Sequence, residues 1–180
     1  SLPLVCLRYT RRWFRASNPM AAFKPHQPLL LRLLHGAVAL LLPLAWLSGL
    51  AVLLVYDHRW FNPGLSLPGN WIDIHGTIAV VLWPLALLFG LYALTWGRFR
   101  LRQPANAAAL ASLALAVGSG KLMDEDWLIE GHLDHLVYNL HVLAWALLAI
   151  MVIWHLTSQL RRGGMSLAMS MFSFRLRKTD

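Results

Sequence analysis

The chain alternates long apolar runs with short polar segments. The runs cover residues 29–55, 71–96, 105–122 and 135–160, and a helix of such length crosses about 30 Å of hydrocarbon. The run 105–122 is the weakest, because it is rich in Ala, Ser and Gly, which let neighbouring helices approach closely. Pro43 and Pro84 lie inside two runs and predict local kinks. The pattern predicts an all-α integral membrane protein, a bundle of four spanning helices.

Composition favours lipid over water as the solvent of this chain. Of its 180 residues, 58% are hydrophobic and only 13% are charged, whereas about 25% charged residues are typical of a soluble domain. In a soluble protein, the net charge of +8 would raise the possibility of nucleic-acid binding. Here the basic residues lie between apolar runs, as in membrane proteins, so we expect no nucleic-acid partner. The single cysteine, Cys6, excludes an intramolecular disulfide and an iron–sulfur cluster held by this chain alone.

The basic residues also predict an orientation. If all four runs cross the membrane, fourteen of the 16 Lys and Arg residues lie on the side that holds both termini, and only Arg59 and Lys121 lie on the other. Basic residues concentrate on the cytoplasmic side of membrane proteins. We therefore expect a multi-pass membrane protein with both termini in the cytoplasm.

Three segments follow from these patterns. Residues 1–28 form a basic cytoplasmic segment and not a secretory signal, because the apolar run after it is too long; Met20 is an alternative start. Residues 29–162 hold the four spans. Residues 163–180 form a cytoplasmic tail, either an amphipathic helix at the membrane surface or a flexible end. The apolar positions of the tail recur at helical spacing: Met165, Ala168, Met169, Phe172 and Leu176.

Four histidines lie inside the apolar runs, where ionisable groups are costly and usually functional. By depth they fall into two layers: His35 with His155 towards the cytoplasm, and His75 with His141 towards the outside. His141 and His155 are fourteen residues apart, so they leave the same side of one helix, roughly 21 Å apart. Each layer offers two imidazoles from different helices, as bis-histidine haem ligation requires. We expect two haems b.

Other interpretations of these residues remain open. A single histidine in a span is more often a hydrogen-bonded structural residue, and zinc is a second candidate metal, although its structural sites usually have four ligands. Arg32, one turn from His35, is a candidate partner for a haem propionate or a snorkelling side chain. Four glycines could leave room for a porphyrin or mark ordinary helix contacts: Gly36, Gly49, Gly76 and Gly90.

The remaining histidines suit solvated or interfacial roles. His26 precedes the first run, His58 and His132 lie in loops, and His135 opens the last run. A weaker idea is that His132 and His135 help proton transfer near a quinone at the outer surface.

The chain resembles the bacterial di-haem cytochrome b family, which includes membrane subunits of nickel–iron hydrogenases and formate dehydrogenases and small quinone-linked cytochromes. The resemblance covers about residues 29–162. Its marks are Arg32-Leu33-Leu34-His35 with Ser48-Gly49 downstream, His75 opening the second run, a third run without histidine, and His141-x13-His155. Gly36 stands where many members carry tryptophan, and no arginine follows His75 within its run. The resemblance implies the same histidine pairing as the depth argument.

The expected function is therefore electron transfer across the membrane through two bis-histidine haems b. The resemblance implies a location in the bacterial inner membrane, with a thylakoid membrane as the alternative. It also implies a membrane quinone as mobile partner, and a partner redox subunit in some members. The chain would then be a quinone-linked oxidoreductase or the electron-transfer subunit of one. Two alternatives are a haem-binding membrane anchor of a dehydrogenase or hydrogenase complex and a transporter that relays protons through histidines. A transporter should carry ionisable residues at mid-membrane, where this sequence has none.

Overall fold

The computed structural model describes residues 28–59, 64, 67–123, 130 and 132–169. Within them the chain is all-helical. Its elements are α2 (Leu29–Tyr56), α3 (Trp71–Leu94), the 3₁₀-helix η2 (Arg98–Arg102), α4 (Pro104–Lys121) and α6 (Leu136–Met169). Most of the predicted N-terminal segment, with Cys6, Met20 and His26, and the last eleven residues of the predicted tail lie outside the described residues.

Local signals explain where several helices begin and bend. The Asn70 side chain caps α3 by accepting a hydrogen bond from the backbone N–H of Asp73 (3.3 Å), and it donates one to the Asp73 carboxylate (2.7 Å). Pro104 occupies the first position of α4, where its missing N–H costs nothing. α6 continues past residue 160, where the predicted last run ends, but Gly164 has φ 61° and ψ −162°, so the helical turn after it takes a new direction. This kink lies at the predicted tail boundary.

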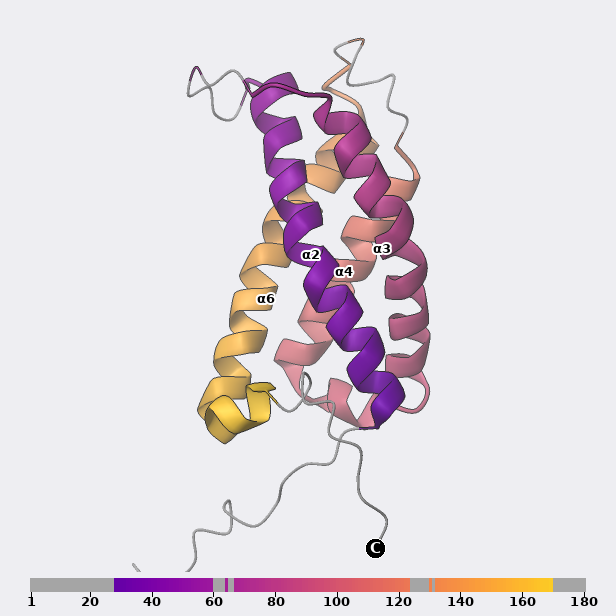
Figure 1. Ribbon diagram of the computed structural model, residues 1–180, viewed down its shortest axis with the longest axis vertical. Helices are drawn as coiled ribbons and strands as arrows, with labels where there is room; N and C mark the ends of the chain where they lie inside the picture. The colour runs from indigo at the N-terminus through magenta and orange to yellow at the C-terminus, as the bar shows by residue number, and fades with distance from the viewer. Residues whose placement is uncertain (1–27, 60–63, 65–66, 124–129, 131, 170–180) are drawn as a thin grey trace, which may run out of the picture.

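The four long helices lie side by side (Figure 1). α2 packs mainly on α3, and α4 mainly on α6. The C-terminal ends of α2 and α4 lie at one end of the molecule, whereas η2 and the kinked end of α6 lie at the other (Figure 1). Buried side chains from all four helices meet in one cluster: Val38, Ala45, Leu82, Ala86, Leu113, Ala116, Ala144 and Leu148.

The outward faces of the helices are apolar. Leu40, Val80 and Ile153 are 71%, 65% and 62% exposed, which is unfavourable in water over so large a surface and expected in lipid. Among the described residues, α2, α3 and α6 are the helices long and apolar enough to cross a membrane. The protein is therefore a membrane protein by its helices. α4 occupies the predicted third run, but it is shorter and more polar, with Ser112 and Ser119 buried.

Candidate functional site

The structure brings together the two predicted histidine pairs. The ring centres of His35 on α2 and His155 on α6 are 6.3 Å apart, and those of His75 on α3 and His141 on α6 are 6.1 Å apart. A metal ion about 2 Å from one nitrogen of each imidazole would separate the ring centres by roughly 6 Å. Both pairs thus have the spacing of two rings that share one ion.

The hydrogen bonds of His75 indicate which ring nitrogen carries the proton. Its Nδ1 lies 2.9 Å from the Ser48 hydroxyl oxygen. That hydroxyl donates its only proton to the carbonyl of Ala45 (3.0 Å), so towards His75 it acts as an acceptor. A neutral His75 therefore donates from Nδ1, and its Nε2 keeps the lone pair that a metal requires.

His141 is held in the same way by α4. Its Nδ1 is 3.1 Å from the carbonyl oxygen of Ala116, which can only accept. It is also 3.1 Å from the hydroxyl of Ser119, whose own proton is directed to the carbonyl of Leu115 (2.7 Å). Both contacts fix the proton on Nδ1 and leave Nε2 unprotonated.

A side-chain amide orients His155. Asn106 at the start of α4 donates from Nδ2 to the carbonyl of Arg100 (2.9 Å), and its Oδ1 accepts from Nε2 of Gln159 (2.9 Å). These bonds set which way the amide faces, so its oxygen also accepts from Nδ1 of His155 (3.0 Å). Metal-bound histidines typically have such partners, which fix the ring and its tautomer. His75, His141 and His155 therefore each have the proton on Nδ1 and a lone pair on Nε2 that can bind a metal.

Two glycines pack directly against imidazoles. A Cβ at Gly49 would lie 3.2 Å from Cε1 of His75, and one at Gly120 would lie 3.0 Å from Cε1 of His141. At Gly36, Gly76 and Gly90 a Cβ would meet nothing within 4 Å, so these three are not close helix contacts. Gly76 borders open space beside His75. The role of Gly120 could not be found from its position in the sequence alone.

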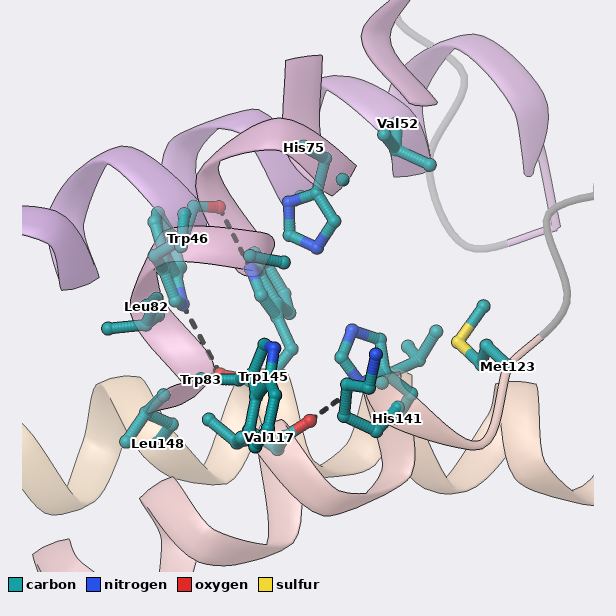
Figure 2. A pocket seen from close by; sticks show the side chains of 18 of the residues that line it. Trp46, Val52, His75, Leu82, Trp83, Val117, Met123, His141, Trp145 and Leu148 are labelled. Carbon is teal, nitrogen blue, oxygen red and sulfur yellow. Dashed lines mark hydrogen bonds between the residues drawn. The ribbon is translucent and has the colours of Figure 1, made fainter. Parts of the chain in front are cut away.

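A cavity of about 700 Å³ lies around the His75–His141 pair, within the range of protein pockets for cofactors and small ligands. Figure 2 shows the two imidazoles projecting into it from facing helices. The lining is almost wholly apolar or aromatic, with contributions from all four long helices. An apolar, roughly disc-shaped cofactor such as a porphyrin suits this lining, and its iron would need the two free Nε2 lone pairs.

Trp46 and Trp145 form one wall of this cavity (Figure 2). Their rings are stacked, 4.5 Å apart and inclined by 10°. Each indole N–H donates to the backbone carbonyl of the other residue, over 3.2 Å from Trp46 and 3.0 Å from Trp145. This reciprocal pair joins α2 to α6 between the two histidine layers.

Arg32 and the His35–His155 pair share the opposite end of the helices. Arg32 is only 5% exposed, which is less than expected of a guanidinium that snorkels to water. A buried guanidinium requires an anion or several acceptors. The edge of the His35 ring meets Phe89 at 5.7 Å between ring centres, so this layer is also bordered by aromatic surface.

A buried carboxylate ties the end of α2 to the start of α6. Asp57 is 0% exposed and accepts hydrogen bonds from Nε and Nη2 of Arg59 (2.9 and 2.8 Å) and from the Tyr138 hydroxyl (2.8 Å). Burial alone would raise the pKa of Asp57, but the hydrogen bonds from Arg59 and Tyr138 together lower it below its ordinary value of 3.8. Asp57 is therefore a stable carboxylate.

The other described histidines belong to neither pair. His58 lies in an exposed turn, His132 contacts the Glu130 carboxylate at 3.4 Å on the surface, and His135 accepts from the backbone N–H of Val137. Among the described residues, no three His, Cys, Asp or Glu side chains come together as a metal-binding group. Comparisons with family models, curated proteins and solved structures found no match to this chain.

Proposed function

We propose that the chain is a di-haem cytochrome b that transfers electrons across a membrane. One haem b would be held by His35 and His155, and the other by His75 and His141, in a bundle of four spanning helices. The observation that carries the proposal is the pair of ring separations, 6.3 and 6.1 Å, at two depths of α6. The free Nε2 atoms of His75, His141 and His155 and the cavity beside the second pair support it.

Bound haem would supply one-electron chemistry, and the protein sets its ligands and surroundings. Ser48, Ser119 and Asn106 hold the imidazoles in the tautomer that binds iron. The apolar lining at the His75–His141 pair would keep water from a bound haem, and a low local dielectric would influence its potential. Arg32, one turn from His35 in the sequence, would neutralise a propionate at the His35–His155 layer.

The two layers are separated by roughly 21 Å along α6, so each haem would lie near one membrane surface. A membrane quinone is the mobile partner that the resemblance to di-haem cytochromes implies. The distribution of basic residues supports a cytoplasmic location of both termini, and the resemblance implies the bacterial inner membrane. A partner redox subunit would make the chain part of a larger oxidoreductase.

A haem count with redox spectroscopy tests the proposal. Purified full-length protein should contain two haems b per chain and show a b-type reduced-minus-oxidised spectrum. The double variants His35→Ala/His155→Ala and His75→Ala/His141→Ala should each retain one haem, because each removes both ligands of one pair. A reduced quinone analogue should reduce the haems of the wild type.

His58→Ala is the matched control, since His58 is exposed in the turn that follows α2; it should keep two haems. A wild-type chain that binds one haem or none under haem-replete expression would contradict the proposal. Two haems that no quinol reduces would favour a haem-binding anchor whose electrons come from another subunit.

A further inference from the structure

Among the described residues that line the cavity at the His75–His141 pair, one carries a charged side chain. The others are aliphatic, aromatic or glycine, together with Met123, the two imidazoles and the phenol of Tyr138. The charged residue is Lys121, the last residue of α4. An apolar cavity with one cation at its edge is suited to a ligand with an apolar body and an acidic end.

The fold positions this ammonium at the cavity edge. Gly120, the preceding residue, lies against the His141 ring, so the chain at Lys121 is fixed relative to a proposed ligand of the iron. The Lys121 Nζ lies 5.4 Å from the centre of the Trp83 ring on α3, and Trp83 also lines the cavity. A cation over an indole face is held there by attraction to the ring.

Arg59, the other basic residue expected at this end of the molecule, is already engaged. Its guanidinium makes a two-pronged contact with the Asp57 carboxylate. In the part of the chain that the structure describes, no carboxylate forms an ion pair with Lys121. Lys121 is therefore the cation at this end best placed to meet an acidic group on a molecule inside the cavity.

We propose that Lys121 binds a carboxylate of the molecule in the His75–His141 cavity, and that this carboxylate is a haem propionate. The inference rests on the proposed function and extends it to the second layer, where the sequence suggested no propionate partner. A propionate bound at Lys121 would orient the porphyrin with its acidic edge towards the end of α4. The shared chemistry, a carboxylate on an apolar body, is also that of a fatty acid.

Binding of haem and of its dimethyl ester to the same protein tests the inference. The His35→Ala/His155→Ala background limits binding to the His75–His141 pair. Full-length protein, prepared without haem in detergent, is titrated with each compound and followed by haem absorbance. Lys121→Gln should weaken haem binding roughly tenfold, as expected when a charge-assisted hydrogen bond is lost. Binding of the ester should not change, because the ester carries no carboxylate.

Lys121→Arg is the matched control and should bind haem like the parent, since it keeps the charge. The inference is overturned if Lys121→Gln leaves haem binding unchanged, or if it weakens haem and ester equally, which would indicate a role in cavity shape alone. A fatty acid that displaces the ester from the parent but not from Lys121→Gln would assign Lys121 to a lipid and also overturn it. If the parent binds neither compound, the proposed function itself fails.

Discussion

Gly120 and Gly118 lie two residues apart on α4, but only Gly120 touches a histidine. A Cβ at Gly120 would lie 3.0 Å from Cε1 of His141, whereas one at Gly118 would meet nothing within 4 Å. Gly120→Ala should therefore displace the His141 ring, widen the His75–His141 pair and reduce occupancy of the second haem several-fold. The haem content and redox titration of purified protein measure this effect.

Gly118→Ala is the control, because both changes raise helix propensity by about 1 kcal/mol and only one crowds an imidazole. Gly118→Ala should keep both haems at wild-type potentials. Equal loss of haem in the two variants would show that the backbone of α4, and not the contact with His141, decides the outcome.

A second prediction concerns pH and Asp57. Its pKa is lowered in the folded protein, so the stabilisation it provides is fully present above the ordinary value of 3.8 and is lost as pH falls through the lower folded value. The wild type should lose thermal stability in this acid range. Asp57→Asn should be less stable at pH 7, because it leaves Arg59 and Tyr138 without their carboxylate, and should lose less on acidification.

Melting temperatures measured by circular dichroism from pH 7 to pH 3 check this prediction. Glu130→Gln is the control, since the Glu130 carboxylate is 60% exposed and should contribute little. An Asp57→Asn protein with the wild-type loss on acidification would show that other carboxylates dominate.

Among single residues, the sequence predicted which histidines lie close together, but not which residues form hydrogen bonds with their rings. The depth of each imidazole follows from its position in an apolar run, so the two pairs could be predicted. Ser119 and Asn106 gave no such signal, because a polar residue in an Ala-rich helix is equally compatible with ordinary packing. Only the structure places them 3.1 and 3.0 Å from His141 and His155. Lys121 appeared in the sequence only as an exception to the charge asymmetry.

At the scale of elements, the apolar runs predicted the helices because burial in lipid selects for continuous apolar sequence. The predicted runs 29–55 and 105–122 became Leu29–Tyr56 and Pro104–Lys121. The end of the last helix was not predicted correctly: the predicted run ends at residue 160, whereas α6 extends to Met169 because the turn after Gly164 is again helical. Contacts between helices were not predictable. Trp46 and Trp145 are 99 residues apart, and no local pattern indicates that they stack.

The Trp46–Trp145 pair should stabilise the contact between α2 and α6. Trp145→Ala removes the stacked ring, one hydrogen bond donor and part of the cavity wall, and should destabilise the protein by about 3–5 kcal/mol. Trp46→Ala should cost a similar amount, and the double variant should cost clearly less than the sum, because both changes remove the same interaction. Thermal or denaturant unfolding in one detergent measures the free energy of unfolding of the wild type, the two single variants and the double variant.

Trp154→Ala is the control on α6. Because Trp154 is 43% exposed, its removal should have a small effect on the free energy of unfolding. Strictly additive losses at Trp46 and Trp145 would mean that the two indoles act independently, each through its own surroundings.

At the scale of the whole molecule, the central question is whether α4 crosses the membrane. Its composition is less apolar than that of α2, α3 and α6, which alone among the described helices are long and apolar enough to span. Its contacts nevertheless attach it to α6 at both histidine layers. Asn106 near its start meets His155, and Ser119 near its end meets His141. Thirteen residues of α4 rise by roughly 20 Å, close to the roughly 21 Å between the two histidines.

If α6 crosses the membrane, for which it is long and apolar enough, we expect a helix that lies antiparallel along it over this depth to cross too. Reporter fusions after Gln103, Leu122 and Arg162 test this topology. Fusions after Gln103 and Arg162 should report the cytoplasmic side, and the fusion after Leu122 the opposite side, because α4 and α6 each reverse the orientation. Should the fusions after Gln103 and Leu122 report the same side, α4 would not cross. The chain would then have three spans, the termini would lie on opposite sides, and the two histidine layers could not both be completed within the membrane.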